Sequence, residues 1–225
     1  MTGWTDILWE GAGILGAVIF FGRFYLQWIV SEREKRSVVP LAFWYMSTVG
    51  SLLLLAYGVR RGSAVGVLSY SFNIVVYARN LIHIWRERGQ LTPKLDRRVH
   101  TGVAAVVIVA AGLVAYTWLH KYASTQLATP EEVRRTWFWI GVGVAGQGLF
   151  AFRFLLQWAA TEIEQKSVIP VAFWYISLAA STLQIASYSQ QREWIYAVGL
   201  ATTILVYLRN LWLIHGHQAA IAPVE

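Results

Sequence analysis

Apolar residues occur in seven long runs that are separated by short polar or charged segments. Most of these runs approach or exceed the roughly 18 residues that an α-helix needs to span a bilayer. The pattern predicts an all-α integral membrane protein with seven transmembrane helices, over residues 7–30, 40–59, 63–85, 101–119, 137–160, 170–187 and 194–214. Pro40 and Pro170 are expected in the first turn of a helix, where a missing N–H has no helical partner. Pro93 is expected to break the chain within a basic loop.

The pattern repeats with a constant offset of 130 residues and no gap. The motif R-F-x-x-Q-W begins at Arg23 and again at Arg153. The motif S-V-x-P-x-A-F-W-Y-x-S follows in both copies, and so does Y-x-R-N-L, which begins at Tyr77 and Tyr207. This agreement indicates a duplication. We therefore expect a first three-helix repeat in residues 1–90, a linker with the fourth helix in 91–135, and a second three-helix repeat in 136–225.

Three helices and one linker helix are an even number, so both repeats are expected to enter the membrane from the same side. They would then be parallel repeats related by a pseudo-twofold axis along the membrane normal. The side that holds the first, third and fifth loops has about nine Lys and Arg residues, and the other side has about six. The positive-inside rule places the first side in the cytoplasm, with the N-terminus periplasmic and the C-terminus cytoplasmic.

Composition agrees with a membrane protein and removes several other classes. Hydrophobic residues make up 56% of the chain and charged residues 14%, and 12 Trp and 11 Tyr suit two interfacial belts. The net charge of +7 lies mostly in short loops, so it reports topology and not nucleic-acid binding. Cysteine is absent, which excludes disulfides and thiolate metal sites. We find no nucleophile–base pair, paired catalytic carboxylates or metal-ligand spacing, and expect no enzyme, cofactor or metal.

An arginine inside an apolar run is the main candidate for function, because a charge in hydrocarbon is costly. Gly16, Phe20, Arg23 and Gln27 follow one another at spacings of four, three and four, so they share one helix face. Arg23 would lie about 10 Å inside the cytoplasmic end of its helix. A single such arginine could equally snorkel to the headgroups or pair with Glu32. Its second copy favours a site.

Four duplicated arginines are expected to meet around the axis between the repeats. Guanidinium suits phosphate, because its planar fork makes bidentate hydrogen bonds and stays charged. The N-termini of the helices that begin at Pro40 and Pro170 would point at the same level. The alternative for Arg79 alone is an interfacial anchor, and the duplicated Phe43 and Trp44 are expected in an aromatic belt. The glutamates of the set below either neutralise the arginines or balance hairpin charge. The candidate substrate-binding residues are Arg23, Gln27, Glu32, Tyr77, Arg79, Asn80, Arg153, Gln157, Glu162, Tyr207, Arg209 and Asn210.

The duplicated motifs resemble the lipid A biosynthesis N-terminal domain family. That membrane family is grouped with the PQ-loop, SWEET and KDEL-receptor-like proteins, and the resemblance covers about two-thirds of the chain. It implies a SWEET-like arrangement of three helices, a linker helix and three helices. It also implies a location in the bacterial inner membrane and a link to envelope glycolipids.

Three functions remain open at this point. The first is a transporter or flippase for a phosphate-bearing lipid, with polyprenyl phosphate, free or linked to a sugar for lipid A or envelope glycan modification, as the best candidate. The second is a small-solute transporter of the SWEET type, with a cleft lined by Asn73 and aromatic residues. The third is a membrane subunit that docks a glycosyltransferase through the basic segment 86–98. Expected partners are therefore a lipid, the membrane and a glycosyltransferase, and not nucleic acid.

Overall fold

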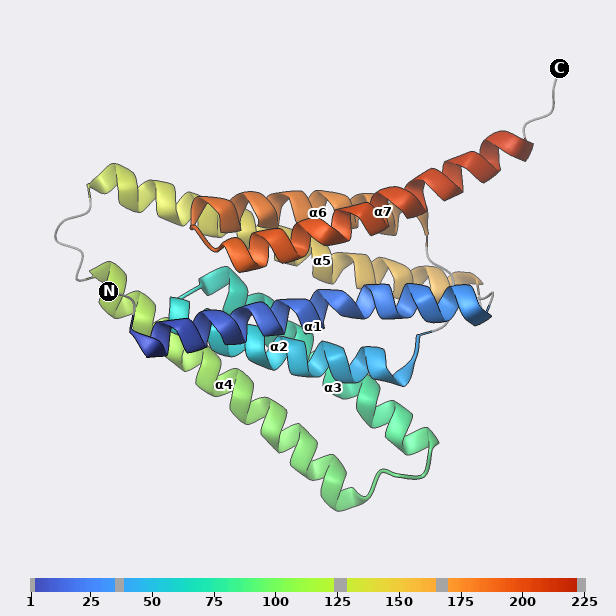
Figure 1. The fold of residues 1–225 in the computed structure, drawn as a ribbon, viewed down its shortest axis with the longest axis horizontal. Helices are drawn as coiled ribbons and strands as arrows, with labels where there is room; N and C mark the ends of the chain where they lie inside the picture. Colours follow the sequence, from blue (N-terminus) through green and yellow to red (C-terminus); the bar gives the residue numbers. More distant parts are fainter. Residues whose placement is uncertain (1–2, 35–38, 124–128, 165–169, 222–225) are drawn as a thin grey trace. The chain divides into compact units, whose positions relative to one another are not determined.

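The protein is described by a computed structural model over residues 3–34, 39–123, 129–164 and 170–221. These residues form seven α-helices and no strand, which confirms the all-helical fold (Figure 1). The helices are α1 (Trp4–Glu34), α2 (Leu41–Arg61), α3 (Ala64–Glu87), α4 (Pro93–Ala123), α5 (Pro130–Glu164), α6 (Val171–Gln190) and α7 (Trp194–Ile221).

Five of these helices are long and apolar enough to cross a membrane. They are α1, α2, α3, the part of α5 over Pro130–Gln157 and the part of α7 over Trp194–Trp212. Among the described residues, α6 does not reach the same mean hydropathy, and it carries Ser177, Ser181, Gln184 and Ser187. The chain is a membrane protein, and the order of three, one and three spanning helices stays a prediction.

Pro93 begins a helix, whereas the sequence pattern predicted that it would break the chain within a basic loop. It takes the first position of α4, where proline is tolerated because its missing N–H has no partner there. The Thr92 hydroxyl caps this helix by accepting a hydrogen bond from the Leu95 N–H at 3.2 Å. The expectation of a basic loop through residue 98 is therefore wrong. Lys94, Arg97 and Arg98 lie on the first turns of α4.

The helix α5 also begins earlier than the apolar run, at Pro130 and not at residue 137. Thr129 and Glu132 form a capping box. The Thr129 N–H donates to the Glu132 carboxylate at 2.9 Å, and the Glu132 N–H donates to the Thr129 hydroxyl at 3.3 Å. Local hydrogen bonding thus extends the helix beyond the apolar segment that a bilayer would cover.

The chain divides into two compact units, residues 1–133 with α1 to α4 and residues 134–225 with most of α5 and with α6 and α7. Each unit is described by itself below. The expected three-part division at residues 90 and 135 is finer and stays a prediction.

Small residues allow the helices of each unit to approach closely. A Cβ added to Gly50 of α2 would lie 2.7 Å from the Phe20 Cβ of α1, and one added to Gly16 would lie 2.8 Å from the Leu53 Cβ. In the second unit a Cβ on Gly146 of α5 would lie 2.8 Å from the Gln184 Cγ of α6. Close backbone contact is the usual way in which membrane helices associate, because lipid provides no hydrophobic drive between them.

Candidate functional site

Arg23 lies on α1 and is only 4% exposed, because four aromatic rings surround its guanidinium. Its Cζ lies 3.5 Å from the ring centroid of Phe20 and 4.5 Å from that of Phe24, both on the same helix. It lies 5.4 Å from the ring of Phe43 on α2 and 5.5 Å from that of Tyr77 on α3. All four distances fall within the range of cation–π attraction. We call these four rings and their arginine the arginine cage of the first unit.

Hydrogen bonds hold the Arg23 guanidinium within this cage. Its Nη1 donates to the Phe20 carbonyl, one turn earlier on α1. Its Nη2 donates to the Tyr77 hydroxyl at 3.1 Å. Because Tyr77 belongs to α3, the arginine joins the first and third helices of the repeat.

The second unit contains the same cage at the duplicated positions. The Arg153 Cζ lies 4.5, 4.8, 4.9 and 6.0 Å from the ring centroids of Phe150, Phe154, Phe173 and Tyr207. Arg153 is half-buried, and its Nη1 donates to the Ser177 hydroxyl at 2.7 Å and to the Tyr207 hydroxyl at 3.4 Å. The Arg153 Nε is buried and has no hydrogen-bond partner among the described residues.

The rings and hydrogen bonds of the cage stabilise the buried guanidinium. A central arginine in a membrane helix costs about 2.5–3.5 kcal/mol on insertion scales. A cation–π contact contributes about 0.5–1 kcal/mol when exposed and about 2 when desolvated. Rings and hydroxyls together therefore offset much of the cost of burial. They also keep the planar fork of the guanidinium in one orientation.

The first turn of α2 and that of α6 lie beside the cages. Phe43 and Phe173, which face the arginines, are each the third residue of their helix. Pro40 and Pro170 hold the N-cap positions with extended backbone, and neither helix has a side-chain cap. The N–H groups of these first turns are therefore not used by a capping side chain, and they add positive potential next to each guanidinium.

The other predicted site residues lie at different distances from the cages. Gln27 is half-buried one turn beyond Arg23 on the same face of α1, and Gln157 has the same place on α5. The Asn80 side-chain amide donates to the Val76 carbonyl of its own helix at 2.8 Å, and that of Asn210 does so to the Val206 carbonyl at 2.7 Å.

Arg79 and Arg209 are exposed and do not face the cage of their own unit. Each follows the cage tyrosine by two residues, which is about 200° around a helix. The structure therefore brings Arg23 together with Tyr77, and Arg153 with Tyr207, while Arg79 and Arg209 lie on another helix face. The expected meeting of all four arginines between the repeats stays a prediction.

Glu32 is exposed near the end of α1 and accepts a hydrogen bond from the Trp28 Nε1 at 3.0 Å. It lies nine residues beyond Arg23, which is about 13 Å along the helix axis. The side chain of Glu162, its counterpart, lies outside the described residues. Neutralisation of the arginines and balance of the hairpin charge both stay predictions for these glutamates.

The predicted set contained the two cage tyrosines but not the cage phenylalanines or Ser177. Phe43 was expected in an interfacial belt, but it faces the Arg23 guanidinium. Its counterpart Phe173 faces Arg153 in the same way, and Ser177 of α6 binds that arginine directly. The available signal was the repeat itself, because all of these positions are identical in both copies. Only a contact between helices distinguishes a belt residue from a cage residue.

Comparison with known families identifies the class of protein. Residues 12–82 and residues 142–212 each match the family described as the Lipid A Biosynthesis N-terminal domain. The chain belongs to this family and contains its domain twice, which confirms the resemblance and the duplication. Each limit of the second match lies 130 residues after that of the first, in agreement with the offset of the repeat. Both cages lie within the matched segments.

Two curated proteins that are similar to this chain have the same name. Lipid-A-disaccharide synthase of Chlamydia felis (strain Fe/C-56) is 26% identical over 203 residues, which are 90% of this chain and 32% of the relative. Lipid-A-disaccharide synthase of Chlamydia trachomatis serovar D is 30% identical over 173 residues, which are 75% of this chain and 28% of the relative. The chain thus spans about a third of the length of the curated relatives that it matches. No solved structure matches it.

These relatives correct one expectation from the sequence. The lack of a catalytic constellation led us to expect that the chain is not an enzyme, yet the proteins similar to most of it are named as synthases. The expectation was wrong. It rested only on the lack of catalytic residue patterns in the membrane segments. Those segments correspond to only about a third of each synthase, so their side chains do not decide the question.

Proposed function

We propose that this chain binds a phosphate-bearing lipid of lipid A biosynthesis at its arginine cages and carries that lipid across the bacterial inner membrane. Polyprenyl phosphate, free or linked to a sugar for lipid A or envelope glycan modification, is the preferred candidate. One observation supports the proposal above all others. An arginine surrounded by four aromatic rings occurs in both units, at positions that the duplication has kept identical.

The chemistry of the cage supports a phosphate ligand. Rings and hydroxyls lessen the cost of burying a guanidinium but do not neutralise its charge. Among the described residues no carboxylate forms an ion pair with Arg153, and its Nε has no partner. A phosphate oxygen would supply both the counter-charge and the acceptor, and a guanidinium binds phosphate bidentately. The uncapped first turn of α6 would add N–H donors on the same side.

The remaining predicted residues extend this proposal to the headgroup. Gln27 and Gln157 are proposed to hydrogen-bond a headgroup one turn beyond the arginines. Asn80 and Asn210 are proposed to hydrogen-bond the same headgroup, and Arg79 and Arg209 to add to the arginines that hold the phosphate. Glu32 and Glu162 are proposed as counter-charges when no lipid is bound. The cages would lie in the cytoplasmic half of the membrane, with the N-terminus periplasmic and the C-terminus cytoplasmic.

The relatives favour a second candidate function. Because they are named as synthases and are about three times as long as this chain, the membrane segments can serve to hold a lipid substrate for a synthase. This function needs the same cage and the same phosphate, together with a glycosyltransferase as partner. It differs from the first in requiring no movement of the lipid between leaflets.

The test uses purified chain in liposomes that contain fluorescent polyprenyl phosphate, and measures both bound lipid and its translocation. Wild type should bind and translocate the lipid. Arg23→Gln together with Arg153→Gln should reduce both by roughly 10- to 100-fold, as for the loss of hydrogen bonds to a charged group. Replacement of both arginines by Lys should restore part of the binding, because charge returns without the fork. Binding without translocation by wild type would favour the second candidate.

The matched control is Arg60→Gln with Arg61→Gln, which also removes two positive charges. The second unit has Gln190 and Gln191 at the corresponding positions, so the control introduces residues that already occur in the other repeat. The control should bind and translocate lipid as wild type does. Unchanged binding in the Arg23 and Arg153 double variant would refute the proposed site.

A further inference from the structure

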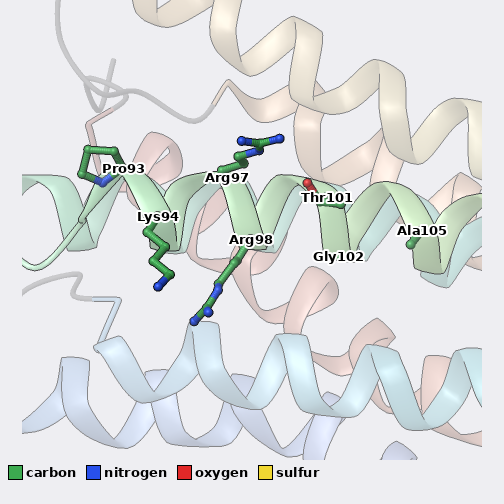
Figure 2. A pocket seen from close by; sticks show the side chains of 7 residues that line it. All are labelled: Pro93, Lys94, Arg97, Arg98, Thr101, Gly102 and Ala105. Atoms are coloured by element: carbon green, nitrogen blue, oxygen red, sulfur yellow. The ribbon is translucent and has the colours of Figure 1, made fainter.

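A groove lies along the first turns of α4, and no residue of either arginine cage lines it. It encloses about 680 Å³ and is lined by Pro93, Lys94, Arg97, Arg98, Thr101, Gly102 and Ala105. Lys94, Arg98, Thr101 and Ala105 follow one another at spacings of four, three and four, so they form one stripe along the helix. Figure 2 shows the Lys94 and Arg98 side chains extending from the same side of α4. We call this feature the α4 groove.

The cationic end of the α4 groove is not neutralised within the described residues. Lys94, Arg97 and Arg98 are exposed, and none of them forms an ion pair there. The nearby Asp96 carboxylate lies 3.5 Å from the His100 Nδ1 and forms no ion pair with these three cations among the described residues. Because α4 begins at Pro93, these cations lie where the helix dipole is already positive, which is an unfavourable place for them. An external anion would relieve this repulsion.

The other end of the groove is apolar and open. Residues 101–113 contain no charged side chain, and Ile108 and Val109 are 71% and 59% exposed. A Cβ added to Gly102 would meet no atom within 4 Å, so space is free at the centre of the groove. The groove therefore joins three cations to an exposed apolar helix surface within a few turns. A ligand that fits it must carry an anionic head directly attached to an apolar chain.

We infer that the α4 groove binds an anionic phospholipid of the cytoplasmic leaflet. The lipid phosphate lies between Lys94 and Arg98, which extend from the same side of α4, and the first part of an acyl chain lies over Gly102 and Ala105. Topology alone explains positive charge at this level of the membrane, but it does not explain a hollow that continues onto an apolar face. An acidic protein segment would satisfy the cations and leave that face uncovered. The inference uses none of the cage residues and does not depend on the proposed function.

Native mass spectrometry of the purified full chain, titrated with phosphatidylglycerol or phosphatidylethanolamine, tests the inference. Wild type should retain phosphatidylglycerol more tightly than phosphatidylethanolamine. Lys94→Gln, Arg97→Gln and Arg98→Gln together should weaken phosphatidylglycerol binding by roughly 100-fold, since each cation near a membrane surface contributes about a factor of 5. Soluble glycerol phosphate should not displace the lipid. Equal retention of the two lipids, or displacement by glycerol phosphate, would overturn the inference.

Two matched controls separate the groove from general surface charge. Arg33→Gln, Arg86→Gln and Arg88→Gln together remove the same charge at the same predicted membrane face, outside the groove, and should leave binding within about threefold of wild type. Gly102→Leu should fill the groove and weaken binding by about tenfold, whereas Gly112→Leu, at another open position of α4, should not. A loss of binding in the Arg33 control equal to that in the groove variant, or full binding by Gly102→Leu, would contradict the proposed site. Circular dichroism confirms that each variant is folded.

Discussion

The two units differ in the interhelical contacts at one of their ends, where the first helix of each unit begins. In the first unit this end is charged: Arg60 pairs with Asp6 at 2.9 Å, Arg61 lies 3.9 Å from Glu10, and Tyr57 donates to Glu10 at 3.2 Å. In the second unit the contacts at the corresponding end are different, and Arg135 donates to the Gln190 side-chain oxygen at 2.9 Å. Ser187 donates to the Trp139 carbonyl at 2.7 Å, and the buried Gln184 donates to Gln147 at 2.8 Å. Two different sets of contacts therefore hold the helices together at this end of the two units.

The opposite end of each unit has changed far less. Both copies retain an arginine, three phenylalanines and a tyrosine in one arrangement. A second contact between helices occurs in both copies, with Trp85 replaced by His215. The Tyr45 hydroxyl accepts a hydrogen bond from the Trp85 Nε1 at 3.0 Å, and the Tyr175 hydroxyl lies 3.3 Å from the His215 Nε2. Many different pairs of side chains can hold two helices together. Residues that bind a ligand are expected to change less, because the ligand requires particular groups in a particular arrangement. The difference between the ends agrees with the proposal that the arginine cages bind a ligand.

The largest expected effect concerns the closest helix approach, where Gly50 corresponds to Ala180. Gly50→Ala should lower the free energy of unfolding by about 3 kcal/mol, because the new Cβ would meet the Phe20 backbone at 2.8 Å and α2 would have to move. Ala180→Gly should cost about 1 kcal/mol or less. Thermal unfolding in detergent measures both. Equal losses in the two units would show that the helix spacing does not differ.

The next effect concerns the buried glutamines, whose counterparts in the first unit are Ala17 and Leu54. Gln184→Leu should lower the free energy of unfolding by about 1–2 kcal/mol, because it removes an interhelical partner of the buried Gln147 amide. Adding Gln147→Ala copies the apolar pair of the first unit and should recover most of this loss. A double variant as unstable as the single one would mean that the glutamine pair is not exchangeable.

A smaller effect distinguishes the two arginine cages. Tyr77→Phe removes the hydroxyl that Arg23 binds at 3.1 Å and should cost about 1 kcal/mol of unfolding free energy. Tyr207→Phe should cost about 0.5 kcal/mol, because Arg153 keeps its shorter bond to Ser177. Combining Tyr207→Phe with Ser177→Ala should bring the loss up to that of Tyr77→Phe. The same unfolding assay measures all three, and the reverse order for the two tyrosines would contradict the difference in geometry.

The smallest effect concerns the ion pair between Arg60 and Asp6, whose side chains are about half exposed. Arg60→Gln copies Gln190 and should lower the free energy of unfolding by less than about 1 kcal/mol at low salt. At about 1 M salt the difference from wild type should disappear, because the Debye length falls to about 3 Å. A loss that persists at high salt would indicate that Arg60 contributes through packing.

The sequence by itself determined the all-helical membrane fold, the duplication and the family. These properties depend on segment length, apolar content and repeated motifs, all of which are written along the chain. It also placed Arg23, Arg153, Tyr77 and Tyr207 among the site residues. It placed the start of α4 wrongly, because the Thr92 cap and the proline at the first helical position extend the helix into a charged segment without an apolar signal.

Tertiary structure alone decided which duplicated residues meet. Phe43 and Ser177 belong to helices other than those of their arginines, and contact between helices depends on how closely glycines such as Gly16 let them approach. The same packing turned Arg79 and Arg209 away from the cages of their units, although both lie two residues from a cage tyrosine. The arginine that interrupts an apolar run is visible in the sequence. The rings that surround it come together only when three helices pack against one another.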